Sequence, residues 1–457
     1  MKRYLSVILG LCISICALFG IAWLFHPKSD YPKMHKFYDN PEEYDVWFMG
    51  SSHAIMSSLP EELYHEYGIR SYNLAEYGQG FPMDYWLVKN FLRLAKPKLI
   101  VLDLAYIGNS EKYSESNINC VRRMVTSLPI SRTKIEMIDD LFEGDRREEM
   151  LFPFSADHYN WESLEKNHLY LEESWEYGSD QNVFRGKGRE GYNLVTASTI
   201  PPPVSMERAN TKDTLNKKYF RRILELCRDN DTDVLVVKCP LQADNGTLKQ
   251  YADGFRIARE YGVPYVNGFE AVGLINGNTD MWDTKHLNSS GARKWTHYLG
   301  EYISQNYPEI MNSPIDDKDK KKWDENYEKY LEWLDTELPL QNSLYSYLLL
   351  CSHPQYQVEI YVLKNSRLFE DEIAVSLLKN IGDFPDLDKA VENHTAYAGT
   401  ASDYTDNRIS ENVKQTSGDI QIVVYSAEGT MVDRACFKTG VSDGSKYEKV
   451  DQDQKTE

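Results

Sequence analysis

Three polar residues at two widely separated places have the side-chain types of a nucleophilic triad. Ser52 follows the apolar run Val46 to Met49 and a glycine, whereas Asp283 and His286 lie together far downstream. At a spacing of three residues the carboxylate can accept the proton on His286 Nδ1, which leaves Nε2 free to take a proton from a hydroxyl. With Ser52 as that hydroxyl, these residues predict an activated serine nucleophile.

Neither stretch is specific by itself. A Gly-Ser-Ser sequence after an apolar run is usually only a loop, and an Asp-x-x-His sequence is usually an exposed polar loop with an incidental histidine. Ser51 is a second candidate nucleophile. Asn288 or Ser289 can cap the helix predicted after His286, which would hold that loop rigid.

The apolar segments around these residues predict a parallel α/β sheet. Four consecutive apolar residues bounded by a charge and a glycine are typical of a strand buried on both faces. Strands separated by helices of ordinary length form right-handed crossovers. The fold class that we predict is a three-layer, flavodoxin-like sheet with Ser52 at the carboxyl end of its first strand, where open α/β sheets bind ligands. After the first strand, further strands are predicted at residues 69–74, 99–104, 233–238 and 264–266, and helices at 59–67, 78–95, 215–228, 248–261 and up to about 303.

The chain also contains an insertion and a C-terminal extension. We predict a hydrolase-like domain at 27–310 with an insertion at 105–210, and insertions of this size are usually functional. Its aromatic residues either stack on sugar rings or form a packed cap; they are Phe152, Phe154, His158, Tyr159 and Trp161. The remaining predicted parts are a charged linker (Asp316 to Lys322) and helix (Trp323 to Leu338) within 311–340, a small α/β accessory domain at 341–441 and a disordered tail at 442–457. In the accessory domain we expect strands at 344–351, 358–364 and 420–425, and a helix at 369–381.

The N-terminal segment predicts a membrane anchor. The uncharged run from Tyr4 to Phe25 is about 22 residues, enough for a helix to cross the hydrocarbon core. A cleavable signal peptide is the alternative, but its apolar region is normally shorter and ends in a small-x-small site. Lys2 and Arg3 precede the run, so the positive-inside rule places the rest outside the cytoplasm. We therefore predict a signal anchor at 1–26 and a single-pass protein of the cell membrane with an extracytoplasmic catalytic domain.

Composition excludes several other classes of protein. The chain has 457 residues, of which 42% are hydrophobic and 26% charged, as in a globular protein. A net charge of −19 argues against a nucleic-acid partner, because phosphates demand clustered Lys and Arg. Of the seven cysteines, two lie in the N-terminal apolar run and the others lack metal-ligand spacing. We predict no disulfide framework, no metal site and no cofactor.

Three motifs in register resemble the SGNH, or GDSL-type, hydrolase superfamily. They are Gly50-Ser51-Ser52 after the first strand, an N-x-x-x-x-G block from Asn73 to Gly78 after the second, and Asp283 to His286 before the final helix. The resemblance covers roughly residues 40 to 310. It implies that Ser52 attacks an ester carbonyl, that His286 acts as base and then acid, and that Asp283 orients it. It also implies that the backbone N–H groups of Ser52 and Gly78 stabilise the oxyanion.

One departure concerns the third oxyanion donor, which the family supplies from an asparagine in a G-x-N-D block after the third strand. Here that asparagine has no ungapped match, so either Asn109 serves after a small insertion, or Tyr106 donates, or the hole has two donors. Residues His53, Asn73 and Tyr106 are candidates for substrate binding. For His53 the alternative is an ordinary hydrogen bond that supports the nucleophile.

An anchor, an SGNH-type domain and a first block without aspartate together resemble proteins that O-acetylate exopolysaccharides or D-alanylate teichoic acids. This resemblance implies a serine esterase or O-acyltransferase that acts on a cell-envelope glycopolymer, beside a possible integral-membrane acyl-donor protein. Hydrolysis and transfer share one acyl-serine intermediate, so the sequence leaves the choice between them open. The alternative is a catalytically inactive scaffold that binds glycan or organises an envelope complex.

Overall fold

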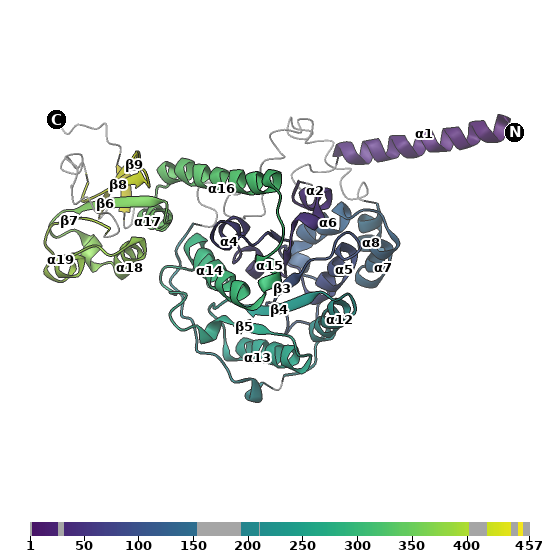
Figure 1. Ribbon diagram of the computed structural model, residues 1–457, viewed down its shortest axis with the longest axis horizontal. Helices are drawn as coiled ribbons and strands as arrows, with labels where there is room; N and C mark the ends of the chain where they lie inside the picture. The colour runs from purple at the N-terminus through teal and green to yellow at the C-terminus, as the bar shows by residue number, and fades with distance from the viewer. Residues whose placement is uncertain are drawn as a thin grey trace.

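The computed structural model describes residues 2–25, 32–152, 193–209, 211–401, 418–439 and 447–450 (Figure 1). The predicted aromatic cluster of the insertion therefore lies outside the described residues except for Phe152, which is exposed. Most of the predicted C-terminal tail lies outside them as well.

A five-stranded parallel sheet forms the centre of the first region. Its strand order is β2-β1-β3-β4-β5, the doubly wound, flavodoxin-like order, and all four neighbouring pairs are parallel. The strands are β1 (Val46–Met49), β2 (Ser71–Asn73), β3 (Leu99–Asp103), β4 (Asp233–Lys238) and β5 (Tyr265–Asn267). Every residue of β1, β2 and β3 is buried. The predicted parallel α/β sheet is thus confirmed.

Helices cover both faces of this sheet. Figure 1 shows α4 packed beside α14 on one side and α5 beside α12 on the other. The contact between α4 and α14 is close, because a Cβ on Gly300 would lie 2.4 Å from the ring of Tyr67. The helices of this region are α2 (Pro32–Asp39), α3 (Ser52–Ile55), α4 (Pro60–Tyr67), α5 (Phe81–Phe91), α6 (Ile118–Ser127), α7 (Arg132–Leu141), α8 (Gly144–Leu151), α12 (Leu215–Asp229), α13 (Asn245–Glu260), α14 (Ser289–Asn306) and α15 (Pro308–Met311).

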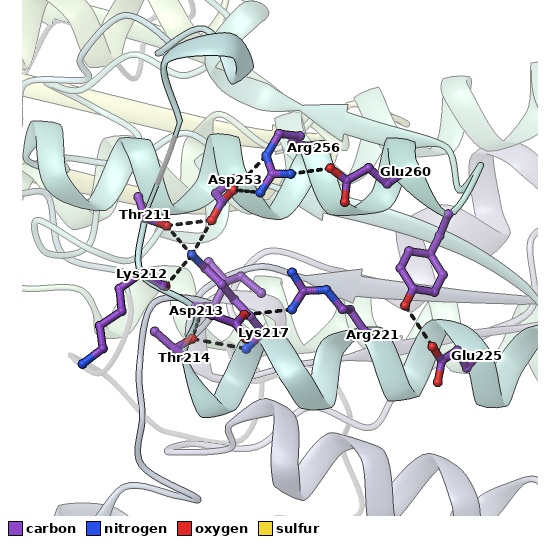
Figure 2. Close-up of polar contacts among 12 residues, drawn as sticks. Thr211, Lys212, Asp213, Thr214, Lys217, Arg221, Glu225, Asp253, Arg256 and Glu260 are labelled. Carbon is purple, nitrogen blue, oxygen red and sulfur yellow. Dashed lines mark hydrogen bonds and ion pairs between the residues drawn. The ribbon is translucent and has the colours of Figure 1, made fainter.

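A buried ion pair joins α12 to α13 (Figure 2). The ammonium of Lys217 donates to Asp253 Oδ2, to Thr211 Oγ1 and, at 2.9 Å, to the carbonyl of Lys212. Burial raises the pKa of Asp253, but the hydrogen bonds from Lys217, Thr211 and Arg256 outweigh it and hold the pKa below its usual value. Removal of either partner of such a pair leaves an uncompensated buried charge, so the pair ties the two helices together.

The C-terminal region is built on a second, antiparallel sheet with its own hydrophobic core. Its strand order is β10-β9-β8-β6-β7. Figure 1 shows α16 running from the parallel-sheet region to this second sheet. Its elements are α16 (Asp317–Glu337), α17 (Leu344–Cys351), β6 (Tyr356–Val362), α18 (Glu372–Ile381), α19 (Leu387–Asn393), β7 (Tyr397–Thr400), β8 (Ile420–Ser426), β9 (Met431–Thr439) and β10 (Tyr447–Val450).

Two of the predictions for this region were wrong. Residues 344–351, predicted as a strand, form α17, because a short and continuously apolar run does not distinguish a buried helix from a buried strand and leucine is a strong helix former. The predicted linker at Asp316 to Lys322 is instead the start of α16. Asp316 caps this helix by accepting the N–H of Asp319. The strands at 358–364 and 420–425 and the helix at 369–381 are confirmed in type.

A buried hydrogen bond connects the two regions. His353, just after α17, lies with its Nε2 3.0 Å from Glu62 Oε1 on α4, and both residues are buried. The backbone N–H of Gln355 donates to His353 Nδ1, so the proton of a neutral ring lies on Nε2 and is donated to the carboxylate. In addition, Arg293 of α14 donates to the carbonyl of Ser352 at 2.5 Å.

The N-terminal segment forms the helix α1 (Lys2–Phe25). Among the helices of the described ranges, none is both long and apolar enough to cross a membrane. The membrane anchor at residues 1–26 stays a prediction.

Candidate active site

A sharp turn from β1 into α3 presents Ser52. Gly50 ends the strand with φ +136°, and a Cβ there would lie 3.1 Å from the Cβ of Asp103 and 3.3 Å from that of Ala54. Ser51 is extended and precedes the helix, so Ser52 is its first residue and is only partly buried. Because glycine tolerates this backbone conformation and this close approach, the turn can be tight enough to expose the Ser52 hydroxyl at the carboxyl edge of the sheet.

Asn73, the last residue of β2, is hydrogen-bonded to α3. It is fully buried, and its Nδ2 donates at 3.4 Å to the carbonyls of Ala54 and Ile55 and to Ser58 Oγ. Its Oδ1 accepts the N–H of Ala75 at 3.1 Å. The structure thus places this predicted substrate-binding residue against α3, where it supports the turn that carries Ser52.

A continuous chain of hydrogen bonds joins the three predicted catalytic residues. Ser52 Oγ lies 2.9 Å from His286 Nε2, and His286 Nδ1 lies 2.9 Å from Asp283 Oδ2. Asp283 Oδ1 also accepts the backbone N–H groups of Lys285 at 2.7 Å and His286 at 2.8 Å. Burial raises the pKa of Asp283, but these hydrogen bonds outweigh it and hold the pKa below its usual value. The carboxylate is therefore ionised and fixes the ring with its proton on Nδ1.

The loop that carries Asp283 and His286 is held at both ends. The backbone N–H of Trp282 donates to the carbonyl of His286 at 2.9 Å. The buried Asn288 caps α14 by accepting the N–H of Gly291 at 3.1 Å, and its Nδ2 donates to the carbonyl of Thr279 at 2.8 Å. The predicted cap is thus confirmed, with Asn288 in the role. These bonds keep the imidazole in place over Ser52.

Gly78 lies in the loop after β2 with φ +75°. A Cβ there would come within 2.5 Å of the Cβ of Asn117, and the carbonyl of Gly78 accepts the N–H of Ser114 at 3.0 Å. Within the described part of the chain, the N–H groups of Ser52 and Gly78 have no hydrogen-bond partner. Both N–H groups are therefore available to an oxyanion.

The loop after β3 contains the two other predicted donors. Asn109 is exposed, and its backbone carbonyl accepts Nδ2 of Asn216 at 2.8 Å. Tyr106 is partly buried, and burial followed by the charge of Glu111 raises the pKa of its hydroxyl. No hydrogen bond joins either side chain to Ser52 or His286 among the residues described. A role for Asn109 or Tyr106 in the oxyanion hole stays a prediction.

A buried polar cluster lies against the nucleophile turn, and the sequence reasoning missed two of its members. Lys238, at the end of β4, lies with its Nζ 2.8 Å from His53 Nδ1 and 3.0 Å from Asp103 Oδ2. The side chains of Lys238 and Asp103 are 0% and 2% exposed. The His53 ring packs edge-to-face on the ring of His286, with centroids 5.2 Å apart. The available signal was a charged residue at the carboxyl end of each of two adjacent buried strands.

The charges in this cluster are fixed by its geometry. Burial lowers the pKa of Lys238, but the attraction of Asp103 outweighs it and raises the pKa above its usual value, so Lys238 stays charged. Burial, then the charge of Lys238, then His286 lower the pKa of His53 well below its usual value. A cationic lysine therefore lies against a neutral imidazole, one residue after the nucleophile.

No metal site is found among the residues that the structure describes, where no group of three or more His, Cys, Asp or Glu side chains could hold an ion. No protein-family model matches the chain, and no curated protein matches it. The fold and the site therefore define a class only: a parallel α/β protein with a Ser-His-Asp hydrogen-bond chain at the carboxyl edge of its sheet.

Proposed function

We propose that this protein is a serine esterase or O-acyltransferase of the SGNH type that acts on a cell-envelope glycopolymer through an acyl-serine intermediate. The observation that carries the proposal is the unbroken hydrogen-bond chain from Ser52 Oγ through the His286 ring to Asp283. A hydroxyl, a base and an orienting carboxylate in this order are the parts that nucleophilic acyl transfer requires.

In the first half-reaction, Ser52 Oγ attacks the carbonyl carbon of an ester, and His286 Nε2 takes the hydroxyl proton. The N–H groups of Ser52 and Gly78 stabilise the resulting oxyanion. Collapse of this tetrahedral intermediate breaks the ester C–O bond, and His286 returns the proton to the departing alcohol. In the second half-reaction, water or a sugar hydroxyl loses its proton to His286 and attacks the acyl carbon. The bond from that carbon to Ser52 Oγ then breaks, His286 returns the proton to Oγ, and the free acid or the acylated sugar leaves.

The proposed setting rests on the sequence. The uncharged run from Tyr4 to Phe25, preceded by Lys2 and Arg3, supports a single-pass anchor with the catalytic region outside the cytoplasm. An acetyl or similar group would come to the active site from an integral-membrane partner, and a cell-envelope glycan would accept or release it. Fractionation of cells tests this part separately: the chain is expected in the membrane fraction and accessible to protease added outside.

A catalytically inactive scaffold that binds glycan or organises an envelope complex is the second candidate. It is favoured by the loop after β3, where Asn109 is exposed and no hydrogen bond among the described residues joins it to the triad. An oxyanion hole with fewer donors would stabilise the intermediate less, because each donor typically contributes about 10²-fold to 10³-fold in rate.

A fluorophosphonate probe, which labels activated serines, separates the two candidates. We expect the full-length wild type to react, Ser52→Ala to lose all labelling and His286→Ala to lose most of it. Ser51→Ala is the matched control, because the neighbouring Ser51 hydroxyl is buried and has no hydrogen-bond partner in the described structure. An unreactive wild type would favour the scaffold, and equal labelling of wild type and Ser52→Ala would exclude Ser52 as the nucleophile.

Hydrolysis and transfer are distinguished by products. With an acylated donor and an oligosaccharide acceptor, mass spectrometry of the acceptor detects transfer as acylated sugar. Free acid with no acylated sugar at any acceptor concentration would contradict the transferase and leave the esterase.

A further inference from the structure

We propose that His53 donates a hydrogen bond from Nε2 to the carbonyl oxygen of the acyl group that reacts at Ser52, and that Lys238 fixes the tautomer in which His53 can do so. The identity of the acyl ligand rests on the proposed function, but the tautomer of His53 does not. His53 thereby becomes a ligand-binding donor beside the nucleophile, and Lys238 and Asp103 become positioning residues.

The tautomer follows from the contact between Lys238 and His53. An ammonium group has three donors and no acceptor. Lys238 Nζ lies 2.8 Å from His53 Nδ1, so Nδ1 must accept with its lone pair. A neutral imidazole carries one proton, and that proton is therefore on Nε2.

The charges around the ring keep it neutral. The charges that lower the pKa of His53 are those of Lys238, His286 and Lys285. The nearest carboxylate in the cluster, Asp103, is bonded to Lys238 and also accepts the N–H of Ala105 at 2.8 Å. A protonated His53 would put a second positive charge directly against Lys238, and burial penalises that charge further. Lys238 itself stays in place because its ammonium also lies over the ring of Tyr251, 5.4 Å from the centroid.

The free donor lies where the acyl group must bind. His53 directly follows Ser52 at the start of α3, is partly exposed, and packs edge-to-face against His286 at an interplanar angle of 82°. Among the described residues, its Nδ1 has Lys238 as a partner, whereas Nε2 has none. An N–H donor with no protein partner beside a nucleophile and its general base fits a ligand oxygen that gains negative charge in the reaction.

The Nε2–H group of His53 is also a candidate for the third donor of the oxyanion hole. In the described structure, neither Asn109 nor Tyr106 is hydrogen-bonded to the triad. A neutral His53 in the Nε2–H form supplies a donor from the nucleophile turn itself. It requires no rearrangement of the loop after β3, because Lys238 at the end of β4, itself paired with Asp103, holds the ring.

The tautomer is tested directly by NMR on the full-length protein with ¹⁵N-labelled histidine, assigned with His53→Gln. We expect His53 to show a protonated Nε2 and an unprotonated Nδ1, with no titration between about pH 5 and 8. A protonated Nδ1, or a titration in that range, would overturn the proposal. Because this measurement needs no substrate, its failure is distinct from a failure of the proposed enzymatic activity.

Substitution of the lysine tests the positioning role. Lys238→Met should allow His53 to change tautomer or to titrate. Lys217→Met is the matched control, since Lys217 is an equally buried lysine paired with a buried aspartate, Asp253, and its partners lie on α13 and just before α12 (Figure 2). The same change in the His53 signals with both variants would show a nonspecific effect and contradict the role of Lys238. If Lys238→Met does not fold, the wild-type spectrum still decides the tautomer.

Two substitutions of His53 test the donor in catalysis with an aryl acetate as substrate. His53→Gln retains both an acceptor for Lys238 and an N–H donor, whereas His53→Phe retains the ring shape without either. We expect the phenylalanine variant to lose about 10²-fold to 10³-fold in kcat with little change in KM, and the glutamine variant to recover a substantial part of that loss. Wild-type kcat in His53→Phe, or equal losses in both variants, would overturn the donor role.

Discussion

Ser52 Oγ and His286 Nε2 lie 2.9 Å apart, although the first belongs to the turn after β1 and the second to the loop before α14. Two structural features, one on each side of the site, set this distance. Gly50 allows the β1-to-α3 turn to be sharp, and Asn288 anchors the His286 loop to the start of α14. Ser52 and His286 are therefore each positioned by residues outside the triad, which makes the roles of the triad side chains testable by substitution.

The Asp283 carboxylate should be essential because it selects the tautomer of His286. In Asp283→Asn the ring of His286 can carry its proton on Nε2 instead of Nδ1, and Nε2 then cannot accept the proton of Ser52. In serine proteases this change costs about 10⁴-fold in kcat. We expect a loss of that order in aryl acetate hydrolysis, with an unchanged fold. Asp244→Asn is the control, since Asp244 caps α13 in a comparable way by accepting the N–H of Thr247. Comparable losses in the two variants would contradict the role of Asp283.

The Gly78 backbone should be needed for rate. In Gly78→Ala the new Cβ would lie 2.5 Å from the Cβ of Asn117, so the loop must shift and carry its N–H away from the oxyanion. We expect kcat to fall by about 10²-fold or more while KM changes little. Gly68→Ala is matched in backbone conformation, with φ +70° against +75°, but its Cβ would meet open space. That control should lose stability and keep kcat; a Gly78→Ala enzyme with wild-type kcat would exclude the proposed donor.

The buried Asp84 should give the fold a distinctive pH dependence. Burial raises its pKa from 3.8 to about 7, although a hydrogen bond from Gln79 lowers it. Because the folded-state pKa is raised, the folded state binds this proton more tightly than the unfolded state. The contribution is complete below about pH 4 and is lost as pH rises to about 7, on the order of 4 kcal/mol.

Asp84→Asn removes that titration and offers an N–H to Gln79 Oε1, which is buried without a partner. Urea unfolding at a series of pH values should therefore show a variant that loses less stability than wild type between about pH 4 and 7. An identical pH dependence in both proteins would show that folding does not raise the pKa of Asp84, and would contradict this prediction.

The Glu62–His353 hydrogen bond should couple the two regions. Burial lowers the pKa of His353, and although burial raises the pKa of Glu62, its hydrogen bond with His353 outweighs this and lowers it. Both depressed values act in the same direction: stability is lost as pH falls below about 6.5 for the histidine and below about 4.5 for the glutamate.

Glu62→Ala leaves the His353 N–H buried without an acceptor, which should cost about 1–3 kcal/mol of unfolding free energy. Glu66→Ala is the control from the same helix, because its pair with His297 is largely exposed and should contribute at most about 1 kcal/mol. Equal effects on denaturant unfolding would contradict a special role for the buried pair.

Local sequence patterns predicted the parallel sheet and the position of Ser52 because both depend on short-range features. A continuous apolar run that ends in glycine specifies a buried strand and its end, and Asp283 and His286 need only a tight loop to meet. The same reasoning failed for residues 344–351, where the run is apolar throughout and carries no period.

The His53–Lys238–Asp103 cluster could not be predicted because it depends on tertiary register. Asp103 and Lys238 become neighbours only when β3 pairs with β4, and His53 reaches them only through the turn after β1. The surroundings of Asn73 also depend on tertiary structure: its place in a motif suggested contact with substrate, and the structure shows it fully buried and hydrogen-bonded to α3.

The site of the covalent adduct tests the central claim most directly. The full-length protein is incubated with a fluorophosphonate or with p-nitrophenyl acetate, quenched in acid, digested and mapped by tandem mass spectrometry. We predict that the adduct lies on Ser52 and that most of it is lost in His286→Ala. An adduct on Ser51 or elsewhere, or no adduct at all in a folded wild-type protein, would contradict the assignment of Ser52 as the nucleophile.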